Sequence, residues 1–151
     1  MLSKKDLQIM SELRRDSRQK LTKISKLVHI PISTIFDRLK IFEDNVIKKN
    51  TVLLNFSSLG FNARANICMK VAKDKRDDLK KFLLTHQNVN SLYKTTNNYD
   101  YIAETVFKNL QEMEKFLERL EDKFSIEKEV FYIIEDIKRE GFLSDPFLTS
   151  F

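Results

Sequence analysis

Apolar residues repeat at helical spacing throughout the first third of the chain. The first such stretch follows Ser3 and Asp6, whose separation fits a capping box, and it predicts a helix that ends near Arg15. Two further apolar faces predict a helix over residues 21–28 and another that begins at Pro31, a residue suited to the first helical position. The residues expected to face inward are Leu21, Ile24, Leu27 and Val28 in the former, and Ile32, Ile35, Leu39 and Phe42 in the latter. Two short amphipathic helices with such a brief break between them are typical of a helix-turn-helix.

The pattern changes after Asn45, which we expect to end the third helix because asparagine tolerates the left-handed conformation. Residues 46–54 are rich in β-forming types and predict a strand, and residues 55–62 form a turn-like joint. Alternation then predicts strands over 63–71, 89–95, 99–107 and 126–137. A helix is expected over 74–85, and a second helix follows Asn109 and Glu112, another capping pair. The order βαββαβ is the ferredoxin-like arrangement, with both helices on one face of an antiparallel sheet.

These elements predict an α+β protein with an N-terminal helix-turn-helix domain joined to a C-terminal ferredoxin-like domain. The expected boundaries are 1–50 for the helix-turn-helix, 51–62 for the linker strand and joint, 63–141 for the ferredoxin-like domain, and 142–151 for an apolar tail. Because apolar side chains are dense in this tail, we expect it to dock on its own domain or on a neighbouring subunit. Its apolar residues are Phe142, Leu143, Phe147, Leu148 and Phe151.

Basic residues are concentrated in the N-terminal part. Residues 1–50 hold 12 Lys and Arg against 6 Asp and Glu, whereas residues 51–151 hold 15 against 16. This asymmetry is expected where one part of a protein neutralises phosphates, although a solvated basic surface without a partner has the same composition. The candidates for phosphate contacts, each of which has the alternative of being a plain surface charge, are Arg14, Arg15, Arg18, Lys20, Lys23, Lys26, Lys48 and Lys49.

The helix that begins at Pro31 carries polar side chains on its other face. Ser33 and Thr34 are short and lie near the N-terminus of the helix, where a helix in the major groove approaches base edges. Arg38 has the length to reach guanine or the backbone, and Phe36 either contacts a thymine methyl or belongs to the core. The expected DNA-binding residues are therefore Ser33, Thr34, Phe36, Asp37, Arg38 and Lys40 on this helix, with Arg18, Lys20 and Lys23 beside it.

The last predicted strand contains an unbroken apolar run, Val130 to Ile134. A sheet covered by helices on one side should instead alternate apolar and polar residues, so a second surface must cover its other face. The simplest cover for this face is the same sheet from another subunit, although an edge strand with one or two exposed apolar residues would give a similar sequence pattern. Such a homodimer would present two helix-turn-helix units to two half-sites on double-stranded DNA.

Other functional classes find little support in the chain. A single cysteine, Cys68, excludes an internal disulfide and a zinc module, and with two glycines phosphate-cradling loops are nearly excluded. The sequence has no paired nucleophile and base, so we expect no enzyme, no metal site and no cofactor. No apolar run is long enough for a membrane helix and no signal peptide is recognisable, which favours a cytoplasmic location. A DNA-wrapping architectural protein with little sequence specificity remains the alternative to a sequence-specific regulator.

The order and spacing of several short motifs resemble those of the Lrp/AsnC (feast/famine) family of transcription regulators. The matches run from Leu2 to about Gly141 and include STIFDRLK at 33–40, Leu-Gly-Phe at 59–61 and Tyr-Asp at 99–100. The resemblance implies dimers, often assembled further into tetramers or octamers, that bind promoter DNA. It also implies a strand between the two domains and, in many members, an amino acid effector held between dimers.

The chain departs from the family pattern at several positions. His29 stands where glycine is common in the turn, Pro31 replaces the usual Ser or Thr cap, and Asn97 replaces the glycine that precedes Tyr-Asp. Because histidine tolerates positive φ better than most residues, we expect the turn to survive. Asn97, and the lack of Ser or Thr in residues 126–138, argue against ordinary amino-acid binding. The expected contacts of a small-molecule effector are Asn97, Asn98, Tyr99 and Asp100, with a simple polar turn as the alternative.

Overall fold

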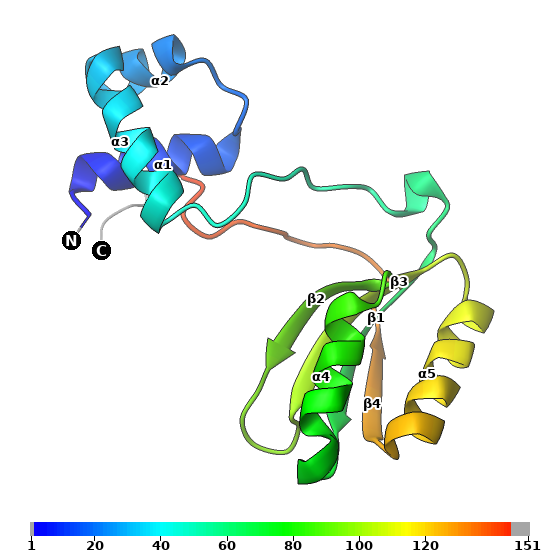
Figure 1. The fold of residues 1–151 in the computed structure, drawn as a ribbon. Helices are drawn as coiled ribbons and strands as arrows, with labels where there is room; N and C mark the ends of the chain where they lie inside the picture. Colours follow the sequence, from blue (N-terminus) through cyan, green and yellow to red (C-terminus); the bar gives the residue numbers. More distant parts are fainter. Residues whose placement is uncertain (1, 146–151) are drawn as a thin grey trace. The chain divides into compact units, whose positions relative to one another are not determined.

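A computed structural model describes residues 2–145 of the chain (Figure 1). The chain divides into two compact units. Within the described residues, 2–53 and 137–145 form a helical unit, and Leu54–Asp136 form a sheet unit. No helix among the described residues is long and apolar enough to cross a membrane. By its contacts, the segment 137–145 groups with the helical unit, and the predicted boundaries at residues 50, 62 and 141 stay predictions.

Three helices build the helical unit: α1 (Lys4–Arg15), α2 (Leu21–Val28) and α3 (Ile32–Asn45). The predicted capping box is confirmed, because the Asp6 N–H donates to Ser3 Oγ and the Ser3 N–H donates to Asp6 Oδ2 at 2.8 Å. The turn between α2 and α3 passes through His29 in the left-handed conformation, with φ of 54°. The turn has thus survived the replacement of glycine by histidine. Pro31 caps α3 instead of occupying its first position.

The core of the helical unit is narrower than the sequence pattern predicts. Ile9, Ile24, Ile35 and Phe42 are buried at its centre. The expected inward positions of Leu27 and Ile32 are wrong, because their side chains are 49% and 44% exposed. Successive residues of a helix are rotated by about 100° around its axis, so residues beside the buried stripe point away from the centre of the core. In a unit of three short helices, Leu27 and Ile32 therefore lie at the rim of the core.

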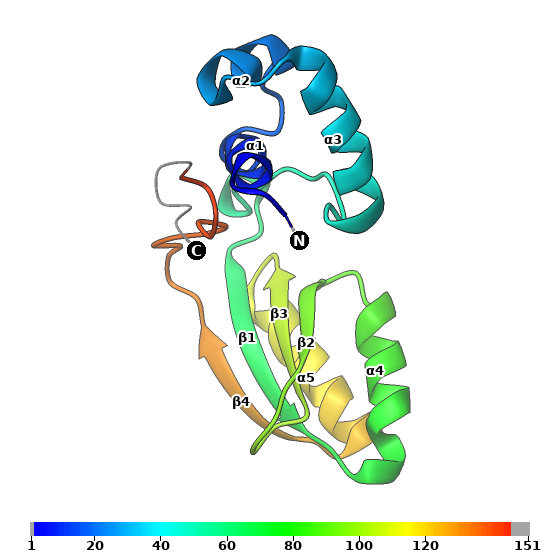
Figure 2. The same cartoon turned by 90° about the vertical axis from the view of Figure 1, so that its left-hand side faces the viewer.

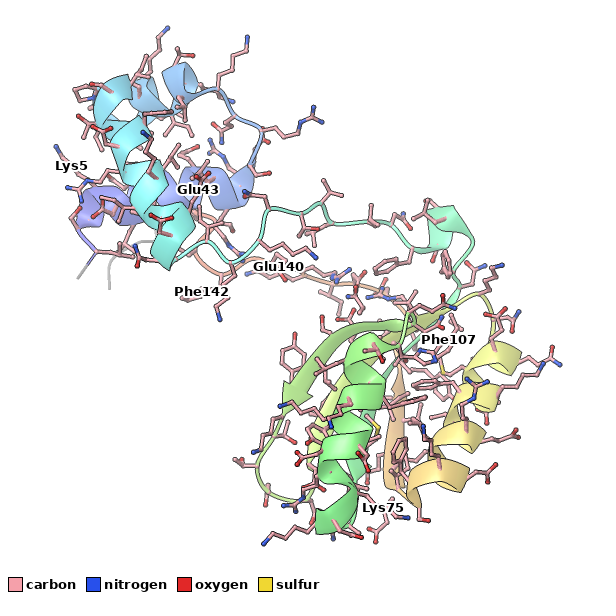
Figure 3. All side chains as sticks on the ribbon, viewed as in Figure 1. Lys5, Glu43, Lys75, Phe107, Glu140 and Phe142 are labelled. Atoms are coloured by element: carbon pink, nitrogen blue, oxygen red, sulfur yellow. The ribbon has the colours of Figure 1, made fainter. Side chains whose placement is uncertain are left out.

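The segment after Ile137 packs against the helical unit. Arg14 on α1 donates to the carbonyl oxygens of Glu140 and Phe142 at 3.1 and 3.0 Å, and it forms an ion pair with the Glu140 carboxylate at 3.0 Å. Leu143 packs on the helical core, whereas Phe142 is 73% exposed. Figure 3 labels Glu140 and Phe142 in this segment. Tail docking is thus observed at Leu143, and Phe147, Leu148 and Phe151 of the predicted tail lie outside the described residues.

The predicted end of α3 at Asn45 is confirmed, but the expected left-handed conformation and the strand predicted after it are wrong. Asn45 is the last helical residue, its φ is not positive, and its side-chain amide donates to the Ile41 carbonyl at 3.0 Å. Residues 47–55 form no strand, and their apolar members Val52, Leu53 and Leu54 are exposed. A β-rich sequence needs a neighbouring backbone for its ladder, and within residues 2–145 no segment pairs with this one.

The sheet unit has the predicted βαββαβ order. Its elements are β1 (Ala63–Lys70), α4 (Arg76–Thr85), β2 (Val89–Lys94), β3 (Tyr101–Phe107), α5 (Leu110–Phe124) and β4 (Glu127–Tyr132). All pairings are antiparallel, in the order β2-β3-β1-β4. Figure 2 shows α4 and α5 on the same side of the sheet, which confirms the ferredoxin-like arrangement. The side chain of Asn109 accepts from the Glu112 N–H, so the second predicted capping pair also forms.

The sheet buries alternate residues of its strands under the two helices. Ala65, Ile67 and Met69 of β1 are fully buried against apolar side chains of α4 and α5, and the Phe107 ring lies 5.3 Å from the Phe116 ring. Figure 3 shows Phe107 at this position. The intervening residues face the opposite side of the sheet. The fold therefore leaves one sheet face without a helical cover.

Candidate nucleic-acid interface

The outer face of α3 is polar and open to solvent. Ser33, Thr34 and Asp37 are exposed, and Phe36 is 51% exposed, with the Lys40 ammonium 4.6 Å from its ring centre. The core alternative for Phe36 is therefore wrong. Ile35 and Phe42 anchor the opposite face of α3 in the helical core, which fixes the direction in which the outer side chains project.

The N-terminus of α3 offers unpaired backbone donors. Its cap, Pro31, makes no side-chain hydrogen bond, and no acidic residue lies in the first turn. The first N–H groups of any helix lack partners within the helix, and together with the helix dipole they attract anions such as phosphate. Ser33 and Thr34 lie in this turn. The start of α3 thus combines short polar side chains with a positive local field.

Arg38, unlike the other predicted residues of this helix face, forms an ion pair within the described part of the chain. Its Nε lies 3.5 Å from Oδ1 of Asp6, which is on α1. Burial opposes ionisation of Asp6, but hydrogen bonds from Ser3 and the charge of Arg38 together lower the pKa of this carboxyl. The Arg38 side chain remains 47% exposed. Sequence reasoning identified Asp6 only as part of a helix cap, because the spacing of residues along the chain does not show that Asp6 faces an arginine.

The basic residues beside α3 fall into two groups. Arg14 is bound by Glu140, and Arg15 pairs with Glu12. Arg18, Lys20 and Lys23 are exposed, and the part of the chain that the structure describes offers them no carboxylate within ion-pair distance. These three residues surround the connection into α2. Lys26, Lys48 and Lys49 are exposed as well and form no ion pair within residues 2–145, so these six candidates carry charges that no neighbouring carboxylate balances.

The predicted effector residues lie in the loop between β2 and β3. Asn97 adopts a positive φ of 77°, the conformation that glycine would favour. Asp100 is fully engaged, because it accepts from the Val71 N–H at 2.9 Å and forms an ion pair with Arg76 at 2.9 Å. A hydrogen bond to Glu129 raises the pKa of Tyr99, with burial as a lesser cause. A hollow of about 620 Å³ in this unit, lined by Phe56, Val89 and Val106 among others, contains none of the four residues.

Arg64 organises the uncovered face of the sheet. It forms two hydrogen bonds with Asp136, at 2.8 and 3.1 Å, and one with Glu104 at 3.3 Å. Its guanidinium also lies over the Phe56 ring at 5.3 Å. Phe131 and Tyr93 on this face are exposed by more than half, so apolar and charged groups share it. Sequence reasoning missed Arg64, since its partners lie 40 and 72 residues away.

Two family models cover most of the chain. Residues 64–140 match the Lrp/AsnC ligand binding domain, and residues 2–45 match a winged helix-turn-helix DNA-binding domain. An HTH-type transcriptional regulator of Pyrococcus horikoshii is 30% identical over 142 residues, which are 93% of this chain and 96% of that protein. The HTH-type transcriptional regulator FL11 of Pyrococcus furiosus is 34% identical over 114 residues, with 75% and 76% covered.

Solved structures share the fold. A transcriptional regulator of Neisseria meningitidis, crystallised as a complex with L-Met, superposes with a TM-score of 0.83 at 23% identity over 92% of this chain and 94% of its own. LrpC of Bacillus subtilis gives 0.83 at 19% identity over 91% and 98%. The matched proteins are regulators and not enzymes, in agreement with the absence of a catalytic constellation in the sequence. The chain belongs to the Lrp/AsnC family of transcriptional regulators.

Proposed function

We propose that this sequence-specific regulator binds DNA by placing the N-terminal half of α3 in the major groove. Ser33, Thr34 and Asp37 would meet base edges or nearby phosphates, and Phe36 would pack on a thymine methyl. The observation that carries the proposal is the outer face of α3, which is exposed and polar while its inner face is locked in the core. Lys40, held over the Phe36 ring, would add a positive charge to the same surface.

Arg18, Lys20 and Lys23 would bind the sugar-phosphate backbone on either side of the groove. Such contacts fix the register of a protein on DNA without reading its sequence. The three side chains suit this role because they are exposed and have no carboxylate neighbour among the described residues. Arg14 and Arg15 are less suited, because intramolecular ion pairs would have to break first.

The sheet face opposite α4 and α5 would form a homodimer. Phe131 and Tyr93 expose apolar surface there, beside the half-buried pair of Arg64 and Glu104. A two-fold dimer would present two copies of α3 to two half-sites, and further assembly to tetramers or octamers is compatible with the same unit. Phe131→Asp should yield monomers in sedimentation, whereas Leu84→Asp, at an exposed position of α4, should not.

An effector, an amino acid or another small molecule, would bind at the loop between β2 and β3, which lies within the residues that match the ligand binding domain. Asn97, Asn98 and Tyr99 are its proposed contacts, while Asp100 holds the loop to β1 and α4. A thermal-shift screen of amino acids against the protein and its Asn98→Ala variant tests this role. The regulator would act where its DNA is, in the cytoplasm.

Selection of duplexes from a random pool, followed by competition binding, tests the proposed DNA contacts. A sequence-reading α3 predicts that the selected duplex binds about a thousandfold or more tightly than random DNA. The triple variant Ser33→Ala/Thr34→Ala/Asp37→Ala should lose most of this ratio but keep its affinity for random DNA. A ratio near one for the native protein would instead favour the DNA-wrapping alternative, which the comparisons do not support.

A further inference from the structure

One carboxylate connects the first turn of α1 to the middle of α3. The two oxygens of Asp6 are divided between two tasks: Oδ2 accepts from the N–H and the hydroxyl of Ser3, at 2.8 and 2.7 Å, and Oδ1 lies 3.5 Å from Nε of Arg38. The Asp6 side chain is 4% exposed. Because both Ser3 bonds are made to Oδ2, the capping box fixes the orientation in which Oδ1 faces α3.

The ion pair with Asp6 is formed at Nε of the guanidinium. Arginine has donors at Nε and at two Nη atoms in a rigid plane, so an ion pair at Nε leaves the Nη end available. The structure gives the Nη atoms of Arg38 no hydrogen-bond acceptor within residues 2–145, and almost half of the side chain is exposed. Arg38 is thus held at its inner side and open at its outer side.

We propose that Asp6 is a positioning residue for DNA binding, which holds Arg38 so that the Nη end of its guanidinium meets a backbone phosphate. This inference rests on the proposed placement of α3 in the major groove. It assigns Arg38 to the backbone and not to a base, because a guanidinium anchored on α1 in the second turn of α3 has lost the freedom to follow a base edge. A held arginine also loses less side-chain entropy on binding.

The charge balance favours this division of roles. A buried carboxylate is stable only when it is hydrogen-bonded and paired, and Asp6 has Ser3 and Arg38 for this purpose. A phosphate on the outer side of Arg38 would place the guanidinium between two anions. Lysine at position 38 would not serve, because a single ammonium cannot contact Asp6 and a phosphate in the same fixed geometry.

The decisive experiment measures binding of the full chain to its selected duplex and to random DNA as a function of salt. Asp6→Asn keeps an acceptor for Ser3 but removes the charge facing Arg38. We expect it to weaken binding to both duplexes by up to about eightfold per half-site at 0.1 M salt and to reduce the salt slope by about one per half-site, the effect of one lost phosphate contact in each. Glu12→Gln is the matched control, since it removes another buried carboxylate of α1 whose partner is Arg15.

Three further variants complete the test. Arg38→Gln should reproduce the loss seen in Asp6→Asn, Arg38→Lys should fail to restore binding, and the double variant should bind no worse than Arg38→Gln alone. The inference is wrong if Asp6→Asn binds like the native protein, if the two losses add, or if Arg38→Lys binds normally. It is also wrong if Arg38→Gln changes the preferred base at one position. Failure of the native protein to prefer any duplex would instead overturn the proposed function.

Discussion

Removal of three unpaired cations should change the salt dependence of DNA binding in a quantitative way. The perturbation is Arg18→Gln/Lys20→Gln/Lys23→Gln, which leaves the helical core untouched because all three side chains are exposed. Each phosphate contact adds about 0.9 to the slope of log K against log salt, so the loss of three per subunit lowers the slope of a dimer by about five. Between 50 and 200 mM salt, a slope difference of about five corresponds to roughly a thousandfold difference in affinity.

Fluorescence anisotropy with a labelled duplex at several salt concentrations measures both slopes. Lys80→Gln/Lys81→Gln/Lys115→Gln is the matched control, because it removes the same charge from exposed positions of α4 and α5. We expect the control to leave the slope near its native value. If the first variant changes the slope by less than about one, or if the control changes it equally, the three residues do not bind phosphates.

Three other outcomes follow from the structure. Burial, aided by the charge of Arg119, lowers the pKa of His86 below its usual 6.5. The neutral His86 therefore favours the folded state above pH 6.5, and this contribution to stability is lost as the pH falls below that value. Urea unfolding from pH 7.5 to 5.5 should show the decline in stability, and His86→Gln should make the decline smaller. Gly60→Ala should lower the free energy of unfolding by about 1–2 kcal/mol, because φ at this position is 85°, a conformation that alanine disfavours. Because no atom lies near the added Cβ, a steric clash contributes nothing, and an unchanged stability would contradict the backbone effect. Replacement of thymine by deoxyuracil in the selected duplex should weaken native binding but not that of Phe36→Ala, and equal losses would exclude the methyl contact.

Local signals in the sequence predicted the fold to within a few residues. Ser3 with Asp6 and Asn109 with Glu112 both form helix caps, because capping depends on residues three apart. The alternation in residues 63–71 likewise identified the central strand β1. Periodicity of this kind is sufficient where a short segment meets a large apolar core.

The errors arise where structure depends on distant partners. Residues 46–54 have the composition of a strand but no neighbouring backbone within the described chain, and Leu27 and Ile32 lie at the rim of a small core. The sequence predicted that Arg14 contacts a phosphate, but in the structure Arg14 pairs with Glu140, which lies 126 residues away. Arg64 was unrecognisable for the same reason. Spacing along a chain carries no information about such pairs.

On the candidate DNA-binding face, too, local features were predictable from the sequence and contacts between distant residues were not. Sequence periodicity placed Ser33, Thr34 and Asp37 on the outer face of α3, and they are exposed there. It left Phe36 open between core and surface, because an aromatic residue at the edge of an apolar stripe fits both. The pairing of Arg38 with Asp6 required three dimensions, since it joins the first helix of the unit to the third.

Interference by 7-deazaguanine tests most directly whether α3 reads the major groove, because this base lacks the N7 acceptor but pairs normally. The selected duplex would carry one substitution at a time, and the affinity of the full chain would be measured for each. We expect substitutions to weaken binding in two clusters whose centres lie about one helical turn, or a multiple of it, apart. Affinities that are unchanged by every major-groove substitution, but lowered by bases altered in the minor groove, would contradict the account.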